Sequence, residues 1–213
     1  ALTTPGDILA RLFQLPTAPD VEPRYNVAPT QMILVVRQRG ESKGKGRDGA
    51  KAGSAGERST DYLHWGLIPF WAEDPSIASR MINARAESAP DKPAYRHAFR
   101  KRRCVIPASG FYEWKKPMKS APAKTPKQPF YVHREDGQPI ALAGLWERWR
   151  PKDEPDAEPI DSVTILTMPP TEQLAELHNR MPVILHPDDI DTWLATQIDV
   201  LTGEKRVTTA DDD

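Results

Sequence analysis

Cysteine is nearly absent from this 213-residue sequence, in which Cys104 is the one thiol. A single cysteine excludes an internal disulfide framework and is typical of a reducing compartment. Long apolar runs are missing too, since none approaches the ~18 residues that would cross a bilayer. The sequence opens with no positively charged stretch followed by an apolar one, which argues against a secretory signal. We therefore expect a protein without a membrane span, located in the cytoplasm or in a nucleus.

Common catalytic and nucleotide-binding motifs are missing as well. There is no GxxxxGK[ST] phosphate loop, no HExxH, no CxxC pair and no GxSxG elbow. The histidines are scattered along the chain at His64, His97, His133, His178 and His186. The sequence therefore predicts neither a metal site nor a cofactor.

Acidic residues are almost missing from residues 95–134. This stretch contains eleven Lys and Arg but a single acid, Glu113. From Pro151 to Asp213 the balance reverses to 15 acids and 4 bases, so the net charge of the whole chain is only −1. Such segregation suits a protein with one face that meets a polyanion. A charge run is also usual on a solvated surface, and that reading stays open.

The apolar pattern predicts many strands and few helices. Strands are expected at 32–38, 61–67, 102–108, 110–115, 128–134, 140–149 and 161–167, and helices at 5–13, 92–101, 170–179 and 186–195. Thr4 is the expected cap of the first helix. Short turns between most of these strands favour an α+β fold with a single domain, built on a curled, largely antiparallel, barrel-like sheet with a few peripheral helices.

Two segments have a composition that does not support packing. Residues 40–60 hold six of the twelve glycines and no apolar side chain larger than alanine, so we expect a mobile surface loop within one domain that spans 1–213. The tail 201–213 has no apolar periodicity. It is either a frayed end or the start of a further element.

Several polar residues lie in apolar or turn-forming surroundings. Asn26 precedes a proline turn at Pro29, and Trp71 follows a second proline. Asn83 and Arg85 are two apart, so their side chains share a face if the segment is extended. Each has a plain structural explanation: Asn26 as a turn cap, the tryptophan as core, Arg85 as a partner of a nearby acid.

His178 and Glu113 likewise have either a functional or a plain structural explanation. His178 near a helix C-terminus can simply complement the helix dipole. A lone glutamate on a strand is usually solvent-facing. Taken singly, none of these residues supports a functional assignment.

Taken together, the motifs point to one family. The segments are RYNVAPTQ, WGLIPFW, INARAES, RRCVIPASGFYEWKK, QPFYV, ALAGLWE and LHNRMPVIL, which run in this order from residue 24 to residue 185. Their order and spacing resemble the SRAP family, the SOS-response-associated peptidases or abasic-site-processing proteins. Members of that family recognise abasic sites in single-stranded DNA and cross-link to them through an N-terminal cysteine.

The resemblance implies a role for each of the polar residues. Glu113 in GFYEW would be the catalytic carboxylate, and His178 in LHNRMP its acid/base partner. Asn83 and Arg85 would hold the nucleotide beside the lesion, while Pro29 and Trp71 would wedge or stack against bases. We therefore assign catalytic roles to Glu113, His178 and Asn83, and nucleic-acid-binding roles to Asn26, Pro29, Trp71 and Arg85.

The sequence also departs from the family pattern. The family's opening segment, Met-Cys-Gly-Arg-Phe, is expected directly before Ala1, and a C-terminal segment is expected after residue 206; neither is in the sequence. We therefore expect a trimmed form of a longer protein or a member that has lost its nucleophile. Cys104 lies in an apolar strand context, so we expect a buried small hydrophobe and not the nucleophile.

The chemistry of the lesion explains why an N-terminus is suited to it. An open abasic sugar is an aldehyde, and an α-amine with a pKa of ~7.7–8.0 attacks it near neutral pH, whereas lysine at ~10.4 is mostly protonated. The expected partner is single-stranded DNA with abasic sites, with replication-fork proteins as further candidates and a monomeric state. Two alternatives stay open: a non-covalent single-strand sensor, and a peptidase that uses Glu113 and His178, with self-processing of its own N-terminus.

Overall fold

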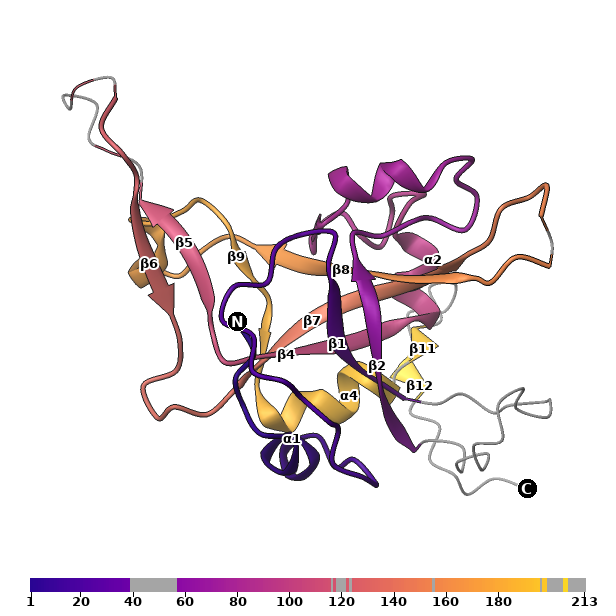
Figure 1. Ribbon diagram of the computed structural model, residues 1–213, viewed down its shortest axis with the longest axis horizontal. Coiled ribbons are helices and arrows are strands. Elements are labelled where there is room, and N and C mark those ends of the chain that lie inside the picture. The colour runs from indigo at the N-terminus through magenta and orange to yellow at the C-terminus, as the bar shows by residue number, and fades with distance from the viewer. Residues whose placement is uncertain are drawn as a thin grey trace.

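The computed structural model describes residues 1–38, 57–115, 117, 122, 124–154 and 156–195, together with the backbone at 197–198 and 205–206. Five strands close into a barrel in the order β7-β4-β1-β2-β8, with β8 pairing back to β7 (Figure 1). They are β1 (Met32–Gln38), β2 (Arg58–Trp65), β4 (Arg103–Ala108), β7 (Ile140–Trp149) and β8 (Ile160–Met168). All neighbours in this barrel are antiparallel except β2 and β8. The predicted fold class is confirmed.

Short strands extend the barrel at its edges. β3 (Asn83–Arg85) runs parallel to β8, β9 (Met181–Pro182) pairs with β8, and β10 (Ile184–Leu185) pairs with β7. β5 (Phe111–Lys115) and β6 (Gln128–Val132) form a separate hairpin, which projects from one end of the barrel in Figure 1. β11 (Gln197–Ile198) pairs with β12 (Lys205–Arg206).

Helices are short and lie around the barrel. They are α1 (Gly6–Leu12), η1 (Pro75–Arg80), α2 (Arg96–Lys101), α3 (Glu172–Ala175), η2 (Pro187–Asp189) and α4 (Ile190–Ala195). α1 and α4 lie together below the barrel in the view of Figure 1. Within the described residues, no helix has the length and apolar character needed to cross a bilayer.

Residues 33–36 show why the barrel strands are continuous apolar runs. Ile33 and Val35 belong to the core inside the barrel, while Leu34 and Val36 pack under α1 and α4 with Leu9. Since a strand points successive side chains to opposite faces, both faces of β1 are covered. The run MILVV therefore has no polar alternation, although it is a strand.

Several expected elements differ from the structure. Thr4 does not cap α1, because its hydroxyl lies 2.9 Å from the Ser109 hydroxyl and Pro5 occupies the cap position. The helix expected at 170–179 contracts to α3, which buries no residue and so lacks the packing that stabilises a longer helix. The helix expected at 92–101 begins only at Arg96.

The two segments of low packing potential lie mostly outside the described residues. Residues 39–56 of the expected loop are not described, but Arg58 to Thr60 at its end belong to β2 and pair with β1. The predicted loop was therefore too long at its C-terminal side. For the tail 201–213, only the backbone pairing of 205–206 is described.

Candidate functional site

The start of the chain is tied to the turn that leads into β5. The nitrogen of Ala1 donates a 2.9 Å hydrogen bond to the carbonyl oxygen of Gly110, and the Ser109 N–H donates one of 2.9 Å to the Ala1 carbonyl. The Ser109 hydroxyl also accepts from the backbone N–H of Thr3 at 2.9 Å. The first residues are therefore held against Gly110, which precedes Glu113 by three positions in the sequence. Figure 1 shows the start of the chain near the beginning of β5.

An apolar cavity of about 350 Å³ opens beside this anchor. Ala1, Asn26 and Pro29 line it together with the rings of Tyr112 and Trp114. The pKa of the Ala1 α-amine is lowered, first by burial and second by the neighbouring Arg24 guanidinium.

Glu113 lies in the middle of the β5–β6 hairpin, opposite Phe130. Its side chain is half-buried and shares a face with Phe111 and Lys115, because strand residues two apart point the same way. Phe111 packs against the barrel core. Glu113 is not among the described residues that line the cavity beside Ala1. Tyr112 and Trp114 occupy the other face and are exposed.

His178 lies in the turn after α3 and is exposed. Its Nδ1 accepts a 3.2 Å hydrogen bond from the backbone N–H of Arg180. An ion pair links this segment to the hairpin, since the Lys115 Nζ is 3.0 Å from the Glu176 carboxylate. Glu113 and His178 are each two residues away from a member of that pair.

Asn83 and Arg85 share an exposed face of β3, with the buried Ala84 between them. The predicted common side is therefore present. Arg85 is in register with Thr167 at the end of β8. Glu87, the acid expected to pair with Arg85, forms its ion pair with Arg180 instead, at 2.7 Å. Among the described residues, no hydrogen bond engages the side chain of Arg85.

Asn26 and Pro29 belong to the turn that leads into β1. Thr30 in this turn has a φ of 71°, which is unusual for a β-branched residue. The Thr30 N–H donates to the Trp65 carbonyl at 2.9 Å, which holds the turn against β2. Arg24 stabilises the turn from its other end through a 2.6 Å hydrogen bond to the side-chain oxygen of Gln31.

The two tryptophans around the second proline have different roles. Trp65 packs against the core and donates from Nε1 to the Ile82 carbonyl at 3.0 Å. Trp71 is 42% exposed and follows Phe70, which is 53% exposed and lies edge-on to the ring of His97. Trp71 is therefore accessible to a ligand, and it is not among the described residues that line the cavity at Ala1.

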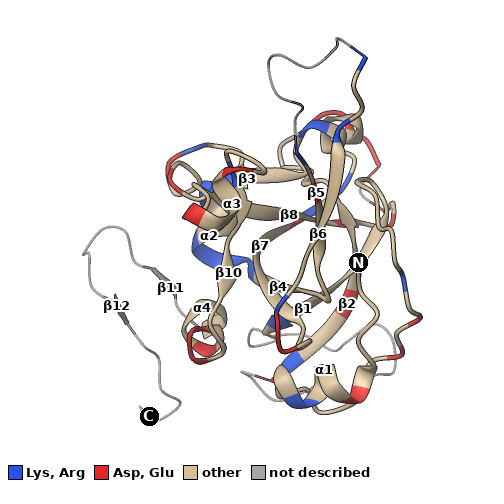
Figure 2. Ribbon diagram, turned by 90° about the vertical axis from the view of Figure 1, so that its left-hand side faces the viewer, with Lys and Arg blue, Asp and Glu red and all other residues tan. Residues whose placement is uncertain are grey.

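The basic stretch 95–134 does not form one continuous track among the described residues. Figure 1 places α2 and the β5–β6 hairpin on opposite sides of the barrel, and Figure 2 shows their basic residues apart as well. Arg102 pairs with Glu147, Arg103 lies over the ring of Trp193, and Arg134 pairs with Asp136. Part of the positive charge of this stretch thus contacts acidic or aromatic side chains of the protein itself.

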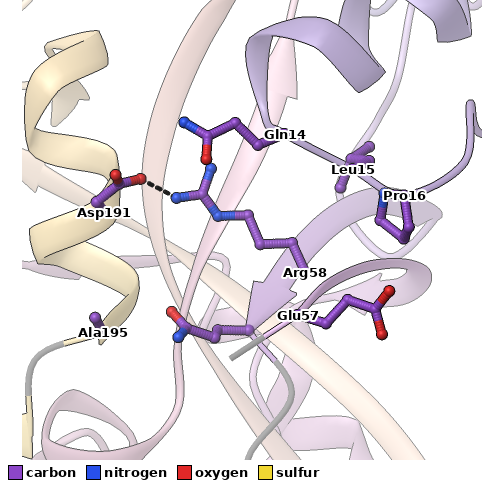
Figure 3. Close-up of a pocket in the computed structure, with 8 residues that line it drawn as sticks. Gln14, Leu15, Pro16, Glu57, Arg58, Asp191 and Ala195 are labelled. Atoms are coloured by element: carbon purple, nitrogen blue, oxygen red, sulfur yellow. Dashed lines mark hydrogen bonds and ion pairs between the residues drawn. The ribbon is translucent and has the colours of Figure 1, made fainter. Parts of the chain in front are cut away.

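A second cavity, of about 450 Å³, lies between α1, β2 and α4 (Figure 3). Arg58 occupies it, donating to the Phe13 carbonyl at 2.9 Å and to the carboxylate of Asp191. Since both partners belong to the fold, the guanidinium joins α1 to α4 and is a structural group. No cluster of three metal-binding side chains occurs in the part of the chain that the structure describes.

Cys104 is fully buried in the barrel core, as predicted. Burial raises the pKa of its thiol well above the usual value, so the thiolate is disfavoured. No sequence pattern pointed to Ser109, Lys115 and Glu176. Their contacts join residues 61 or 106 positions apart, which no local pattern encodes.

These features define an α+β barrel protein in which Ala1 lies at an apolar cavity, next to a strand with a half-buried carboxylate. The family described as SOS response associated peptidase (SRAP) matches residues 1–210. This chain belongs to the SRAP family.

Relatives with this domain occur in bacteria and eukaryotes. The abasic site processing protein YoqW of Bacillus subtilis is 38% identical over 175 residues, which are 82% of this chain and 68% of YoqW. The abasic site processing protein YedK of Escherichia coli is 29% identical over 200 residues, 92% of this chain and 77% of YedK. For the abasic site processing protein HMCES of Xenopus tropicalis the identity is 28% over 166 residues, 68% of this chain and 47% of HMCES.

Solved structures share the fold. A protein from Bordetella bronchiseptica superimposes with a TM-score of 0.69 at 28% identity, over 91% of this chain and 85% of that one. A protein from Bacteroides thetaiotaomicron gives a TM-score of 0.56 at 30% identity, over 63% of this chain and 58% of that chain. This chain thus spans less than two thirds of the Bacteroides protein.

Proposed function

We propose that this chain recognises abasic sites in single-stranded DNA and captures the opened sugar covalently at its N-terminal nitrogen. The observation that carries the proposal is the anchor of Ala1 on Gly110, at an apolar cavity and three residues ahead of Glu113. The names of the relatives, which are abasic site processing proteins, support the choice of lesion.

The chemistry needs an amine and two proton-handling groups. The neutral amine attacks the sugar aldehyde to give a carbinolamine, which loses water to form an imine. Where the mature chain begins with cysteine, its S–H adds across the C=N bond, forming a C–S and an N–H bond in a five-membered ring. Each step moves a proton, for which we assign Glu113 and His178.

The other assigned residues would hold the strand around the lesion. Asn83 and Arg85 offer an amide and a guanidinium from one exposed face of β3, which suits a sugar-phosphate backbone. Asn26 and Pro29 at the cavity and the exposed Trp71 would contact flanking bases. Stacking on such side chains contributes about 1–3 kcal/mol per base and requires unpaired bases, hence single-stranded DNA.

The test uses the protein with its natural N-terminus and an oligonucleotide with one abasic site. We expect a retarded species on a denaturing gel, absent with the intact oligonucleotide. Glu113→Gln should abolish it while binding in native conditions persists. Glu135→Gln, which removes an exposed carboxylate in the turn after β6, is the matched control. If the wild type binds abasic DNA but forms no species that survives denaturation, the protein is a non-covalent sensor.

Self-processing of the N-terminus is the second candidate activity. It is favoured by the family's description as a peptidase and by the position of the Ala1 nitrogen beside the Glu113 strand. Intact mass of a form with a short leader should show loss of the leader in the wild type and retention in Glu113→Gln. Cleavage of unrelated peptides would favour a general hydrolase.

The remaining expectations about partners and location follow from the DNA substrate. A protein that acts on abasic DNA would be found in the bacterial cytoplasm at the nucleoid, or in the nucleus of a eukaryote. Replication-fork proteins as partners and a monomeric state stay predictions.

A further inference from the structure

The segment that carries His178 is joined by an ion pair to the hairpin that carries Glu113. The Lys115 Nζ lies 3.0 Å from the Glu176 carboxylate, across 61 positions of sequence. Lys115 shares the β5 face of Glu113, and Glu176 precedes His178 by two residues. The pair therefore bridges the two groups to which we assign proton transfer.

A second ion pair joins the same segment to the turn after β3. Arg180 donates to both carboxylate oxygens of Glu87, at 2.7 and 2.9 Å, across 93 positions. The same guanidinium donates to the Thr167 carbonyl at 2.5 Å. The hydrogen bonds from Arg180 hold the pKa of Glu87 at about 2, so the carboxylate stays charged at neutral pH.

Thr167 fixes this second contact to the barrel. It pairs with Arg85 of β3 on one side and with Pro182 of β9 on the other. Its hydroxyl also donates to the Ala84 carbonyl at 3.3 Å. Arg180 thus contacts the point where β3, β8 and β9 meet, and its own N–H donates to the ring of His178.

We propose that the ion pairs Lys115–Glu176 and Glu87–Arg180 are positioning contacts that hold His178 in register with Glu113 and Arg85. Both members of each ion pair lie two positions in sequence from an assigned site residue. Lys115 is two positions from Glu113, Glu87 is two positions from Arg85, and both Glu176 and Arg180 are two positions from His178. α3 buries no side chain, so packing alone gives this segment little support. The four residues act through His178 and do not touch the reacting atoms.

The catalytic part of this inference rests on the proposed function, and the positioning part does not. Exposed ion pairs contribute little to global stability, so their loss should leave the unfolding midpoint nearly unchanged. Proton transfer depends strongly on geometry, and displacement by ~1 Å can slow a reaction by up to about a hundredfold. The unfolding midpoint and the cross-linking rate therefore distinguish a loss of stability from a loss of positioning.

The first experiment follows the imidazole of His178 by NMR in the protein without DNA. Glu87→Gln and Glu176→Gln should shift its ring resonances and broaden them, because the segment becomes less ordered. Asp136→Asn is the matched control for Glu87→Gln, since Asp136 is also an exposed carboxylate that Arg134 holds at a pKa of about 2. Unchanged His178 signals in both test variants would overturn the inference.

The second experiment measures the cross-linking rate at saturating abasic DNA. Lys115→Glu and Glu176→Lys should each lower the rate by about tenfold, and the double variant with exchanged charges should recover it to within about threefold. A double variant as slow as the single ones, or single variants at the wild-type rate, would contradict the proposal.

The two experiments distinguish failure of the inference from failure of the function. If the wild type cross-links and the variants match it, the positioning inference is wrong and the function stands. If the wild type does not cross-link, the function is wrong, and the NMR experiment alone decides whether the ion pairs hold His178.

Discussion

The carboxylate of Glu147 on β7, which is only 1% exposed, forms an ion pair with the guanidinium of Arg102 at the end of α2. Nδ1 of His97, on the same helix, lies 3.2 Å from the other carboxylate oxygen. A buried charge of this kind tolerates the loss of its partner poorly, because the group left behind stays desolvated. The contact therefore fixes α2 to the barrel.

We predict that Arg102→Ala, which leaves the buried Glu147 carboxylate without its ion-pair partner, lowers the free energy of unfolding by about 3 kcal/mol. Urea denaturation followed by tryptophan fluorescence measures it. Glu135→Ala, which removes an exposed glutamate, should change the same quantity by less than about 0.5 kcal/mol. Equal effects of the two substitutions would show that the buried pair does not stabilise the fold.

Arg85→Ala should weaken binding to single-stranded DNA and make it less dependent on salt. Each phosphate contact adds about 0.7 to the slope of log K against log salt for a single strand. The slope should therefore fall by about 0.7 in titrations from low to moderate salt. Arg11→Ala, at an exposed arginine of α1, serves as the control and should leave the slope unchanged.

Thr30→Gly should stabilise the protein. The φ of 71° strains a β-branched residue, and glycine adopts this conformation freely. We expect a gain of about 1 kcal/mol after the higher chain entropy of glycine in the unfolded state is included. Thr60→Gly, in the middle of β2, should be destabilising by a similar amount in the same denaturation assay.

Cys104 should not react with thiol reagents in the folded protein. It is fully buried and its pKa is raised, so both access and thiolate formation are blocked. Reaction with a disulfide reagent at pH 8 should be at least about a thousandfold slower than in urea, because it requires the opening of the core. Rapid labelling of the native protein would refute this packing.

The barrel strands were predictable from the sequence because each carries its own signal. β1 and β7 have the predicted bounds, and β4 and β8 differ by one residue at their ends. β2 begins three residues earlier and ends two residues earlier than predicted. Apolar runs of seven to ten residues between turn-forming segments are sufficient for this. α3 could not be predicted in the same way, since the periodicity of 170–179 is helical but its surface lacks a partner to pack on.

The sequence by itself determined the residue types and the family, because motifs such as GFYEW, INAR and LHNRMP are local strings whose order is kept along the chain. Only the tertiary structure decided that Ala1 lies on Gly110, that Glu87 pairs with Arg180 and not with Arg85, and that the basic stretch divides between α2 and the hairpin. Ala1 and Gly110 are 109 positions apart and Glu87 and Arg180 are 93 positions apart. Barrel closure, which no short window of sequence encodes, brings each of these pairs together.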